Sequence, residues 1–513
     1  MISVVTLADV VREGVGGHVL HGDPRTVISG VRHDSRDVGP GDLFVAMPGR
    51  AADGARFAED AVARGAVAVM TQEELAGLRV PQLVVDDARR QLARAAAVVY
   101  GHPTFALDVV GITGTNGKTT TAHLVEQALS ASPGAVPAVL GTVAMCGPGF
   151  SRSAPHTTPE GDEIARFARE VLDLGATHLV MEVSSHALTQ HRVEAVRFRV
   201  AAFTNLTQDH LDFHGTMEGY AAAKDRLFLE LGPGASVVNV DDAHGAELAQ
   251  KLRGHNLWRC SLRADADAEV RVLRWSMDAS GIHADIATPR GEVAIRSPLL
   301  GAHNVENLLV ALACGLALDI DLEALGVALS AATGAPGRLE RVEDPRGVAV
   351  LVDYAHTPDA LQRVLAALRP VTSGRLLCVF GCGGDRDRGK RPLMGEAAGR
   401  GADVLFVTSD NPRTEAPDAI LAHIVPGVIS TGQPSLTSTQ LASAPRGYAL
   451  IEDRRAAIRS AIAAARSGDT VLIAGKGHED YQIVGTLKYP FDDRLVAREA
   501  IASAVSAAAG GGA

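Results

Sequence analysis

The segment Leu107-Asp-Val-Val-Gly-Ile-Thr-Gly-Thr-Asn-Gly-Lys-Thr119 decides how the middle of this chain folds. Its apolar beginning, residues 107–112, predicts a buried strand, and the amphipathic pattern over residues 119–130 predicts a helix. The glycines between them let backbone N–H groups face an anion, and the dipole of the helix N-terminus adds to that attraction. Lys118 would neutralise phosphate charge, and the Thr119 hydroxyl would bind Mg²⁺. The segment therefore predicts a phosphate-binding strand–loop–helix.

The loop departs from the strict P-loop pattern at one position. That pattern has a glycine five positions before Gly117, and Ile112 stands there instead. A structural glycine turn without a ligand is the alternative, and the strand and helix on either side argue against it. The nucleotide contacts predicted in this loop are Gly114, Thr115, Asn116, Gly117, Lys118, Thr119 and Thr120.

Short apolar strands alternate with helical patterns along the rest of the chain. Strands at residues 178–183, 198–203 and 235–240 indicate a mostly parallel sheet around the loop. A polar, alternating stretch at residues 269–295 predicts a few antiparallel strands at the side. A second α/β unit follows, with strands expected at residues 348–352, 375–380, 403–408 and 470–473.

The length of 513 residues suggests about three domains. Breaks rich in glycine and proline occur at Gly101-His-Pro103 and Thr333-Gly-Ala-Pro-Gly337. We therefore expect domains at residues 1–101, 102–334 and 335–513. The first mixes short strands with alanine-rich helices, so all three are expected to be α/β.

Composition excludes several classes of protein. With 46% hydrophobic residues the chain can build several cores, so disorder does not dominate it. Its net charge of −11 argues against a large basic nucleic-acid surface but not against a local phosphate pocket. Five cysteines without CxxC spacing predict free thiols in a reducing cytosol. We see no signal peptide, and the longest apolar run, Leu308 to Leu318, is too short to span a bilayer, so we expect a soluble cytoplasmic protein.

Acidic and histidine side chains follow two predicted strands, at the ends where open parallel sheets place ligand groups. Glu182 ends one of these strands. After the next strand, residues 204–215 carry Asp209, His210, Asp212 and His214. Because Mg²⁺ prefers few carboxylates together with phosphate and water, Glu182 and Thr119 would suffice for one ion. For His214 we prefer a hydrogen-bonded structural role.

Five motifs together resemble the Mur ligase family, the ATP-dependent amide-bond ligases of peptidoglycan precursor synthesis. They are GTNGKT (residues 114–119), MEVSSHAL (181–188), TNLTQDHLDFHG (204–215), GAHNVEN (301–307) and DYAHTP (353–358). The likeness extends from about residue 31 to about residue 480. It implies a small α/β UDP-binding domain, a central P-loop ATPase-like domain with a mostly parallel sheet, and a C-terminal Rossmann-like α/β domain.

The resemblance also implies roles that the local sequence does not reveal. By itself Lys224 is expected to be a solvent-exposed helix lysine, but the family resemblance makes it a carbamate, formed with CO₂, that ligates a second Mg²⁺. Arg338 would reach the nucleotide phosphates, and Asn307 and Asp353 would contact adenine and ribose. The catalytic residues implied are Lys118, Lys224, His210 and Arg338. The metal ligands implied are Thr119, Glu182, His210 and Lys224 as its carbamate.

The first block narrows the choice within the family. Residues 34–36, 40–46 and 53–57 resemble the UDP-binding domain of the members that add the third residue or the terminal dipeptide. His33 stands where an aliphatic residue is expected against the uracil. The contacts implied for the UDP-linked muramoyl peptide are Ser35, Arg50, Ala51, Ala52, Thr157, Thr158, Ser184, Gln190 and Arg192.

The third block points to the incoming amino acid. Asp410-Asn-Pro-Arg413 follows an apolar strand, and this DNPR motif resembles the diaminopimelate-using form of the ligase that adds the third residue. Arg413 can bind a carboxylate through two hydrogen bonds, and the terminal ammonium of lysine offers no such partner. Taken alone, the motif could equally be a type I turn. The diaminopimelate contacts implied are Arg386, Asp410, Asn411, Pro412, Arg413, Gly475 and Glu479, of which Glu479 would hold the distal ammonium.

The resemblance implies ATP and Mg²⁺ as cofactors, and UDP-N-acetylmuramoyl-L-alanyl-D-glutamate and diaminopimelate as substrates. The substrate carboxylate would attack the γ-phosphorus to give an acyl phosphate, which the diaminopimelate amine then attacks. Positioning and charge neutralisation would carry most of the catalysis. We expect a monomer that neither binds nucleic acid nor inserts into a membrane.

Two alternatives share the phosphate loop. Folylpolyglutamate synthase has the same loop and lysine chemistry but no reason to carry a UDP-binding block or the DNPR motif. A nucleotide-driven switch has no reason to carry two further pockets. ATP turnover separates them, because a ligase releases phosphate only when both the UDP-linked dipeptide and an amino acid are present.

Overall fold

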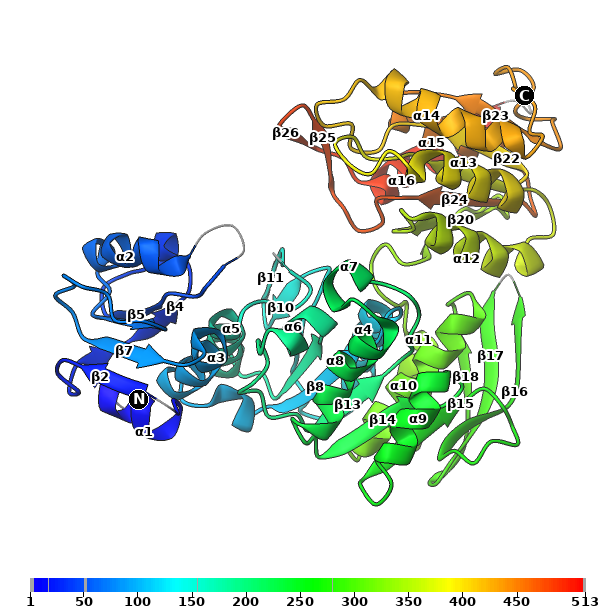
Figure 1. Ribbon diagram of the computed structural model, residues 1–513. Coiled ribbons are helices and arrows are strands. Elements are labelled where there is room, and N and C mark those ends of the chain that lie inside the picture. Colours follow the sequence, from blue (N-terminus) through cyan, green and yellow to red (C-terminus); the bar gives the residue numbers. More distant parts are fainter. Residues whose placement is uncertain (1–3, 17, 50–52, 155, 279, 511–513) are drawn as a thin grey trace. The chain divides into compact units, whose positions relative to one another are not determined.

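The computed structural model describes residues 4–16, 18–49, 53–154, 156–278 and 280–510 (Figure 1). The chain forms two compact units. The first comprises Met1–Leu273, Asp285–Val293 and Glu306–Leu329, and the second comprises Arg274–Ala284, Ala294–Val305 and Ser330–Ala513.

The N-terminal part of the first unit is a five-stranded sheet with helices on both faces, drawn in blue in Figure 1. Its strand order is β2 (His18–His21), β7 (Gln82–Val85), β6 (Ala68–Thr71), β5 (Asp42–Val45) and β4 (Gly30–Arg32). The pair β2–β7 is antiparallel and the other pairs are parallel. Helices α1 (Leu7–Glu13) and α3 (Ala88–Val99) share one core with the sheet. Helix α2 (Ala58–Arg64) packs against Phe44 on the other face, and β1 (Val5–Thr6) pairs with β3 (Val27–Ile28) beside the sheet.

An eleven-stranded sheet forms the centre of the chain. Its order is β11 (Phe150–Arg152), β10 (Met145–Gly147), β9 (Pro137–Leu140), β12 (His178–Glu182), β8 (Asp108–Thr113), β13 (Val200–Phe203), β14 (Ala235–Asn239), β15 (Leu257–Ser261), β16 (Val270–Asp278), β17 (Gly281–Thr288) and β18 (Gly291–Ser297). All neighbouring pairs from β9 to β16 are parallel, as the alternation of strands and helices predicts.

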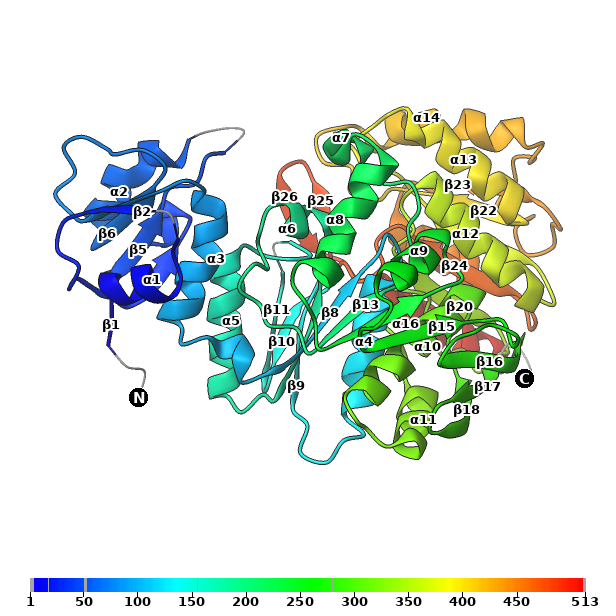
Figure 2. The same cartoon turned by 60° about the horizontal axis from the view of Figure 1, so that its bottom comes forward.

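Helices cover this sheet and connect its strands (Figure 2). Helices α5 (Gly161–Asp173), α8 (Met217–Leu229) and α9 (Ala243–Lys251) share a core with the sheet residues Leu179 and Phe203. The remaining helices of this part are α4 (Lys118–Leu129), α6 (Ser185–Thr189), α7 (Leu211–His214), α10 (Ala302–Ala317) and α11 (Leu322–Ala331). Short 3₁₀ helices η1 to η4 span Ser35–Asp37, Gly54–Phe57, Pro103–Phe105 and Arg369–Val371.

The register of the central strands brings three loops to one edge. Ile112 of β8 lies opposite Glu182 of β12, and Thr113 lies opposite Phe203 of β13. The loops after β8, β12 and β13 therefore leave the sheet side by side at its carboxyl edge. This is where an open α/β sheet binds ligands, because the chain runs to one side of β8 first and to the other side later.

The second unit contains a six-stranded sheet wound on both faces. Its order is β19 (Glu340–Val342), β20 (Ala349–Asp353), β24 (Thr470–Ala474), β21 (Leu376–Phe380), β22 (Val404–Val407) and β23 (Gly447–Leu450), with only the pair β19–β20 antiparallel among these described strands. Successive residues of β21 alternate between two cores, because neighbouring side chains of a strand point to opposite faces. Helices α12 (Pro358–Leu368), α13 (Lys390–Gly401) and α14 (Pro417–Ser430) enclose one core, and α15 (Arg454–Ala464) and α16 (Asp493–Gly510) enclose the other. The hairpin β25 (Tyr481–Val484) and β26 (Leu487–Pro490) stands apart from this sheet.

The predicted α/β fold class is confirmed, as is the predicted strand–loop–helix, which the structure forms as β8 and α4. In the described part of the chain, no helix combines the length and apolar character needed to cross a membrane.

Candidate active site

The predicted phosphate loop closes tightly between β8 and α4. Gly114 and Gly117 have φ angles of +149° and +84°, a region that glycine enters without steric cost. A Cβ on Gly117 would lie 2.5 Å from Asn307 Oδ1, which also accepts a hydrogen bond from Thr121 Oγ1 at 3.1 Å. Lys118 Nζ donates to the carbonyl of Gly114 at 2.8 Å, so its ammonium lies folded across the loop. Close packing therefore fixes both ends of the loop.

The segment after β13 forms one wall of this loop. The carbonyl and side-chain oxygens of Asn205 accept hydrogen bonds from the N–H groups of Thr115 and Asn116, at 2.8 and 2.9 Å. Thr204 Oγ1 donates to the Asn116 carbonyl at 2.6 Å. Sequence reasoning did not assign these two residues, although both stand in the quoted TNLTQDHLDFHG motif. With this part of the loop held by protein, the first turn of α4, which includes the buried Thr120, is the part that presents N–H groups to an anion.

Glu182 is buried at the end of β12, next to the start of α4. Thr119 Oγ1 donates to Glu182 Oε2 at 3.0 Å, and Thr142 donates to both carboxylate oxygens, at 2.7 and 3.1 Å. A hydroxyl and a carboxylate thus meet beside the phosphate loop, which suits Mg²⁺, because that ion takes few protein ligands together with phosphate and water. Within the described residues, no three His, Cys, Asp or Glu side chains form a ready-made metal cluster. The pair formed by Thr119 and Glu182 fits a metal that arrives with a nucleotide, whose phosphate and water supply the other ligands.

Lys224 is buried, so the exposed position that its local sequence predicts is wrong. The residue is 1% exposed, and its Nζ donates to the carbonyl of Gly114 at 2.9 Å. The same nitrogen lies 4.4 Å from the centre of the Tyr220 ring. Burial, together with the nearby charge of Lys118, holds the pKa of Lys224 well below its ordinary value. The amine faces the phosphate loop rather than water.

His210 is the N-cap residue of the short helix α7 and has a left-handed conformation, with φ +52°. Its ring lies 6.1 Å from the ring of Tyr220, the same ring that Lys224 contacts. His210 and Lys224, both predicted to be metal ligands, therefore flank one tyrosine. His214 Nε2 lies 2.9 Å from Ser185 Oγ, a hydrogen bond that ties α7 to α6.

Five residues predicted to hold the UDP-linked peptide lie around the end of β12. They are Thr157, Thr158, Ser184, Gln190 and Arg192. Thr158 Oγ1 donates to the carbonyl of Glu182 at 2.8 Å and accepts from the N–H of Ser184 at 3.0 Å. Arg192 donates to the carbonyl of Thr158 and to Gln190 Oε1, both at 2.7 Å. Thr158 is thus hydrogen bonded to the strand end that carries Glu182, and Arg192 is hydrogen bonded to Thr158.

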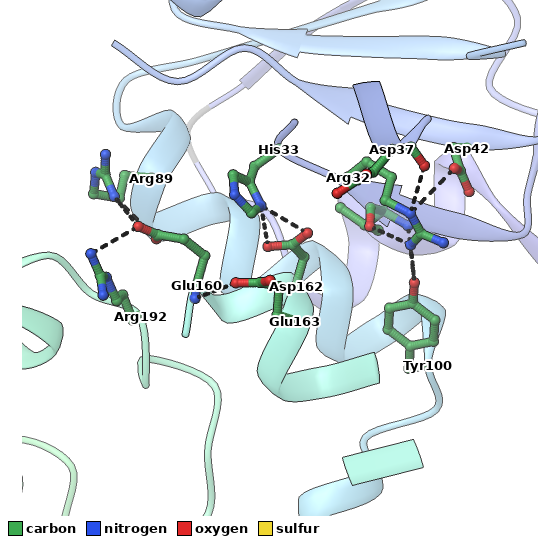
Figure 3. Close-up of polar contacts among 11 residues, drawn as sticks. Arg32, His33, Asp37, Asp42, Arg89, Tyr100, Glu160, Asp162, Glu163 and Arg192 are labelled. Atoms are coloured by element: carbon green, nitrogen blue, oxygen red, sulfur yellow. Dashed lines mark hydrogen bonds and ion pairs between the residues drawn. The ribbon is translucent and has the colours of Figure 1, made fainter. Parts of the chain in front are cut away.

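The structure describes only some of the residues that are predicted to contact the uridine. Ser35 is buried at the start of η1, whereas Arg50, Ala51 and Ala52 lie outside the described residues. His33, at the position where an aliphatic residue is expected against the uracil, turns toward the central part of the chain. Its Nδ1 lies 2.8 and 3.0 Å from the two carboxylate oxygens of the buried Asp162 in α5 (Figure 3).

In the second unit, the loops after β21 and β22 bring two predicted diaminopimelate contacts together. Arg413 Nη1 donates to the carbonyl of Gly384 at 2.9 Å. A Cβ on Gly383 would lie 3.0 Å from the same nitrogen and 3.6 Å from Arg386 Cγ, so the two arginines flank this glycine. Arg413 has a φ of +51°, and its N–H donates to the carbonyl of Ile483, which holds the DNPR turn against β25.

A buried cluster lies beside this turn. Lys476 is fully buried and donates to Glu479 Oε2 at 2.8 Å and to Asn411 Oδ1 at 3.3 Å. Asn411 Nδ2 also donates to Glu479, at 3.0 Å. Gly475 has a φ of +116°, and a Cβ there would lie 2.7 Å from Asp410 Oδ2. Lys476 received no role from the sequence, although its position three residues before Glu479 was a signal that could have found it.

Two residues predicted to contact the nucleotide also lie in the second unit. Asp353 is buried and accepts hydrogen bonds from the N–H groups of Leu339 and Ala355, at 2.7 and 2.8 Å. Burial raises the pKa of this carboxyl. The Arg338 guanidinium lies 4.8 Å from the centre of the Tyr354 ring. Its buried Nε has no hydrogen-bond partner among the described residues.

Comparison with known proteins covers nearly the whole chain. Three family models match it: "Mur ligase family, catalytic domain" over residues 27–100, "Mur ligase middle domain" over 112–315, and "Mur ligase, glutamate ligase domain" over 337–477. A curated relative from Geobacter metallireducens, named UDP-N-acetylmuramoyl-L-alanyl-D-glutamate--2,6-diaminopimelate ligase, is 48% identical over 480 residues, which cover 91% of this chain and 93% of the relative.

Solved structures of other proteins also align with most of this chain. A ligase of the same name aligns with a TM-score of 0.71 and 35% identity, covering 98% of this chain and 99% of the other. A folylpolyglutamate synthase from Mycobacterium tuberculosis aligns with a TM-score of 0.57, covering 75% of this chain and 91% of its own. At 21% identity, this second likeness extends to the fold alone.

Proposed function

The chain belongs to the Mur ligase family, and we propose that it joins diaminopimelate to UDP-N-acetylmuramoyl-L-alanyl-D-glutamate, converting ATP to ADP and phosphate. One observation supports diaminopimelate as the incoming amino acid. Arg386 and Arg413 flank Gly383 beside a cluster that contains the carboxylate of Glu479. Cations and an anion so arranged suit an amino acid whose far end carries both a carboxylate and an ammonium group.

The reaction has two bond-forming steps. A carboxylate oxygen of the D-glutamyl group attacks the γ-phosphorus, the bond to ADP breaks, and an acyl phosphate forms. The amine of diaminopimelate then attacks the acyl carbon and loses a proton, and the tetrahedral intermediate expels phosphate. No side-chain nucleophile is needed, so binding and charge neutralisation are the protein's contribution.

The chain's own residues supply that contribution. Lys118 and the N-terminus of α4 would neutralise the charge on the transferred phosphoryl group. We propose that Arg338 acts on the same phosphates, and that Asn307 and Asp353 contact the adenine and the ribose. The five residues around the end of β12 would hold the muramoyl peptide, with the buried Ser35 on its uridine side.

When bound, Mg²⁺ supplies charge neutralisation at the phosphates. Thr119 and Glu182 are the residues that would hold it, because hydroxyl and carboxylate already lie 3.0 Å apart beside the loop. For a second ion we propose Lys224, as its carbamate, and His210. The buried position of the Lys224 amine at the loop carbonyl supports this assignment.

We further propose three domains, at residues 1–101, 102–334 and 335–513, each of which contains one region that a family model matches. Because ATP and a UDP-linked precursor are the substrates, the reaction belongs in the cytoplasm, in the building of the cell wall. We expect a monomer to suffice, since one chain carries every residue proposed above.

Phosphate release tests this function. The purified chain, with ATP and Mg²⁺, should release phosphate only when the UDP-linked dipeptide and diaminopimelate are both present, and mass spectrometry should find the tripeptide product in equal amount. Release of phosphate with neither substrate would indicate a nucleotide switch instead. Activity with a folate and glutamate, but not with these two substrates, would indicate a polyglutamate synthase.

A further inference from the structure

The first turn of α5 carries carboxylates that face the N-terminal domain (Figure 3). Glu160 receives two hydrogen bonds from Arg89 of α3, with Nη1 at 3.0 and 3.1 Å from its two oxygens. On its other side, Arg192 Nη2 lies 3.1 Å from Glu160 Oε1. One carboxylate thus lies between an arginine of the N-terminal domain and an arginine proposed to hold the substrate.

We propose that Glu160 is a positioning residue for the UDP-linked dipeptide, because it orients Arg192. Arg89 assists by fixing the carboxylate of Glu160 in place. This inference rests on the proposed function, in which Arg192 contacts that substrate. Nothing in it requires Glu160 to touch the substrate itself.

The geometry around Arg192 leaves its guanidinium little freedom. Besides Glu160, it donates to the carbonyl of Thr158 and to Gln190 Oε1, both at 2.7 Å. A guanidinium presents its donors in a rigid planar fork, so these two hydrogen bonds and the ion pair with Glu160 together define its orientation. Glu160 is the only charged group among these three partners, and its ion pair with Arg192 adds an electrostatic attraction that the two neutral oxygens do not supply.

The position of Glu160 is itself fixed. It is the N-cap residue of α5, and its N–H donates to Glu163 Oε2 at 3.1 Å in a capping box. At the next residue, a Cβ on Gly161 would lie 2.6 Å from the Cβ of Ala93, so α3 and α5 pack in direct contact here. The backbone that carries the carboxylate therefore cannot shift toward a displaced Arg192 without disturbing the packing of α5 against α3.

Charge gives Glu160 a second effect. Arg89 and Arg192 both approach its oxygens, and their side chains are 25% and 14% exposed. Without the carboxylate, two guanidinium groups would face each other in a site with little water, and repulsion would turn Arg192 away from its present place. Burial lowers the pKa of Arg192, with the charge of Arg89 adding to this effect and that of Glu160 opposing it.

The chain offers a matched control. Glu194 is similarly buried, with a side chain 7% exposed against 11% for Glu160, and it also pairs with arginines of α3, Arg90 and Arg94. In the described part of the chain, its ion pairs and hydrogen bonds are with Arg90, Arg94 and His191 and not with Arg192. Replacing Glu194 therefore weakens the same junction between the domains and leaves the hold on Arg192 in place.

The experiment compares Glu160→Gln with Glu194→Gln in the complete enzyme. Glu160→Gln should raise KM for the UDP-linked dipeptide by about ten- to hundred-fold, with KM for ATP and for diaminopimelate changed by less than about threefold. Arg89→Ala should raise the same KM, by a smaller factor. Glu194→Gln should lower the melting temperature about as much as Glu160→Gln while leaving all three KM values near wild type.

Other results would overturn the inference. Equal changes of KM in Glu160→Gln and Glu194→Gln would reduce Glu160 to a structural residue of the junction. If Glu160→Gln does not fold, Arg89→Ala decides the matter alone, and an unchanged KM for the dipeptide counts against the proposal. If Arg192→Ala leaves that KM unchanged, the inference falls because its premise is wrong, whereas continued tripeptide synthesis by the wild type would show that the proposed ligase activity stands.

Discussion

The buried amine of Lys224 donates a 2.9 Å hydrogen bond to the carbonyl of Gly114, the first residue of the phosphate loop. Through this contact, α8 is joined to the loop that follows β8. Lys118 donates to the same carbonyl at 2.8 Å. Two amines therefore converge on one oxygen, and a carbamate on the Lys224 nitrogen would place a negative charge beside the ammonium of Lys118.

Removal of the Lys224 side chain tests that idea. Lys224→Ala should be almost inactive, and added short carboxylic acids such as formate or acetate should restore part of the activity by replacing the missing anion. The measurement is the ligation rate with and without the acid. Lys251→Ala is the control, because this half-exposed lysine of α9 pairs with Asp225 of α8 rather than with the loop, and the variant should stay near wild-type activity. An unmodified Lys224 pointing to solvent in an ATP- and Mg²⁺-bound crystal structure would contradict the assignment.

Lys118→Ala should abolish ligation while the fold stays intact. The side chain is only partly buried and contacts loop carbonyls rather than the core, so its loss removes phosphate neutralisation without leaving a cavity. We expect a loss of at least about a thousand-fold in kcat/KM, with an unchanged circular dichroism spectrum and a similar melting temperature. A variant that keeps a substantial share of wild-type turnover would show that the loop does not bind the reacting phosphates.

The fold around the phosphate loop could be predicted from sequence because its signals are local. The apolar run of β8, the glycines and the amphipathic α4 follow one another within residues 107–130. That Glu182 reaches the loop follows from a general rule, since parallel strands end at the same edge of their sheet. Such inferences need only the order of elements along the chain.

The burial of Lys224 and the contacts of Glu160 could not be predicted from the neighbouring sequence. Lys224 follows three alanines, so its neighbours do not indicate which face of α8 is buried. Glu160 contacts Arg89 and Arg192, which lie 71 and 32 positions away in the sequence, so only tertiary packing brings the three together. The contact between Lys476 and Asn411 escapes local signals for a similar reason, because the two residues lie 65 positions apart.

The His33–Asp162 pair should make stability depend on pH. Burial works against the charged form of His33, but the hydrogen bond and charge of Asp162, together with Glu163 and Glu160 on the same turn, outweigh it and raise the pKa of His33 above 6.5. A raised pKa stabilises the fold fully below the unfolded value, and this contribution is lost as the pH rises through the folded value. His33→Leu should therefore lose on the order of 1 kcal/mol at pH 6 and less at pH 9.

Urea unfolding at both pH values measures this difference. Wild type should lose stability from pH 6 to pH 9 by more than His33→Leu does. Asp162→Asn, which removes the charge opposite the same ring, should flatten the profile in the same way. Equal pH dependence in wild type and His33→Leu would mean that the pair carries no net charge interaction.

Selectivity for the incoming amino acid tests the second unit. Arg413 should face the distal carboxylate of diaminopimelate, which lysine lacks, so bound lysine would leave a charged donor without its partner. Because an unpaired charged donor is costly, kcat/KM for lysine should be lower than kcat/KM for diaminopimelate by about three orders of magnitude or more. Arg413→Ala should use diaminopimelate far less well and should discriminate less against lysine, because the group that penalises lysine is gone.

Arg388→Ala is the control, since this exposed arginine pairs with Glu415 and is outside the proposed pocket. The measurement is kcat/KM for both amino acids in all three proteins. A diaminopimelate-to-lysine ratio that is the same in Arg413→Ala and in wild type would remove Arg413 from the selectivity site.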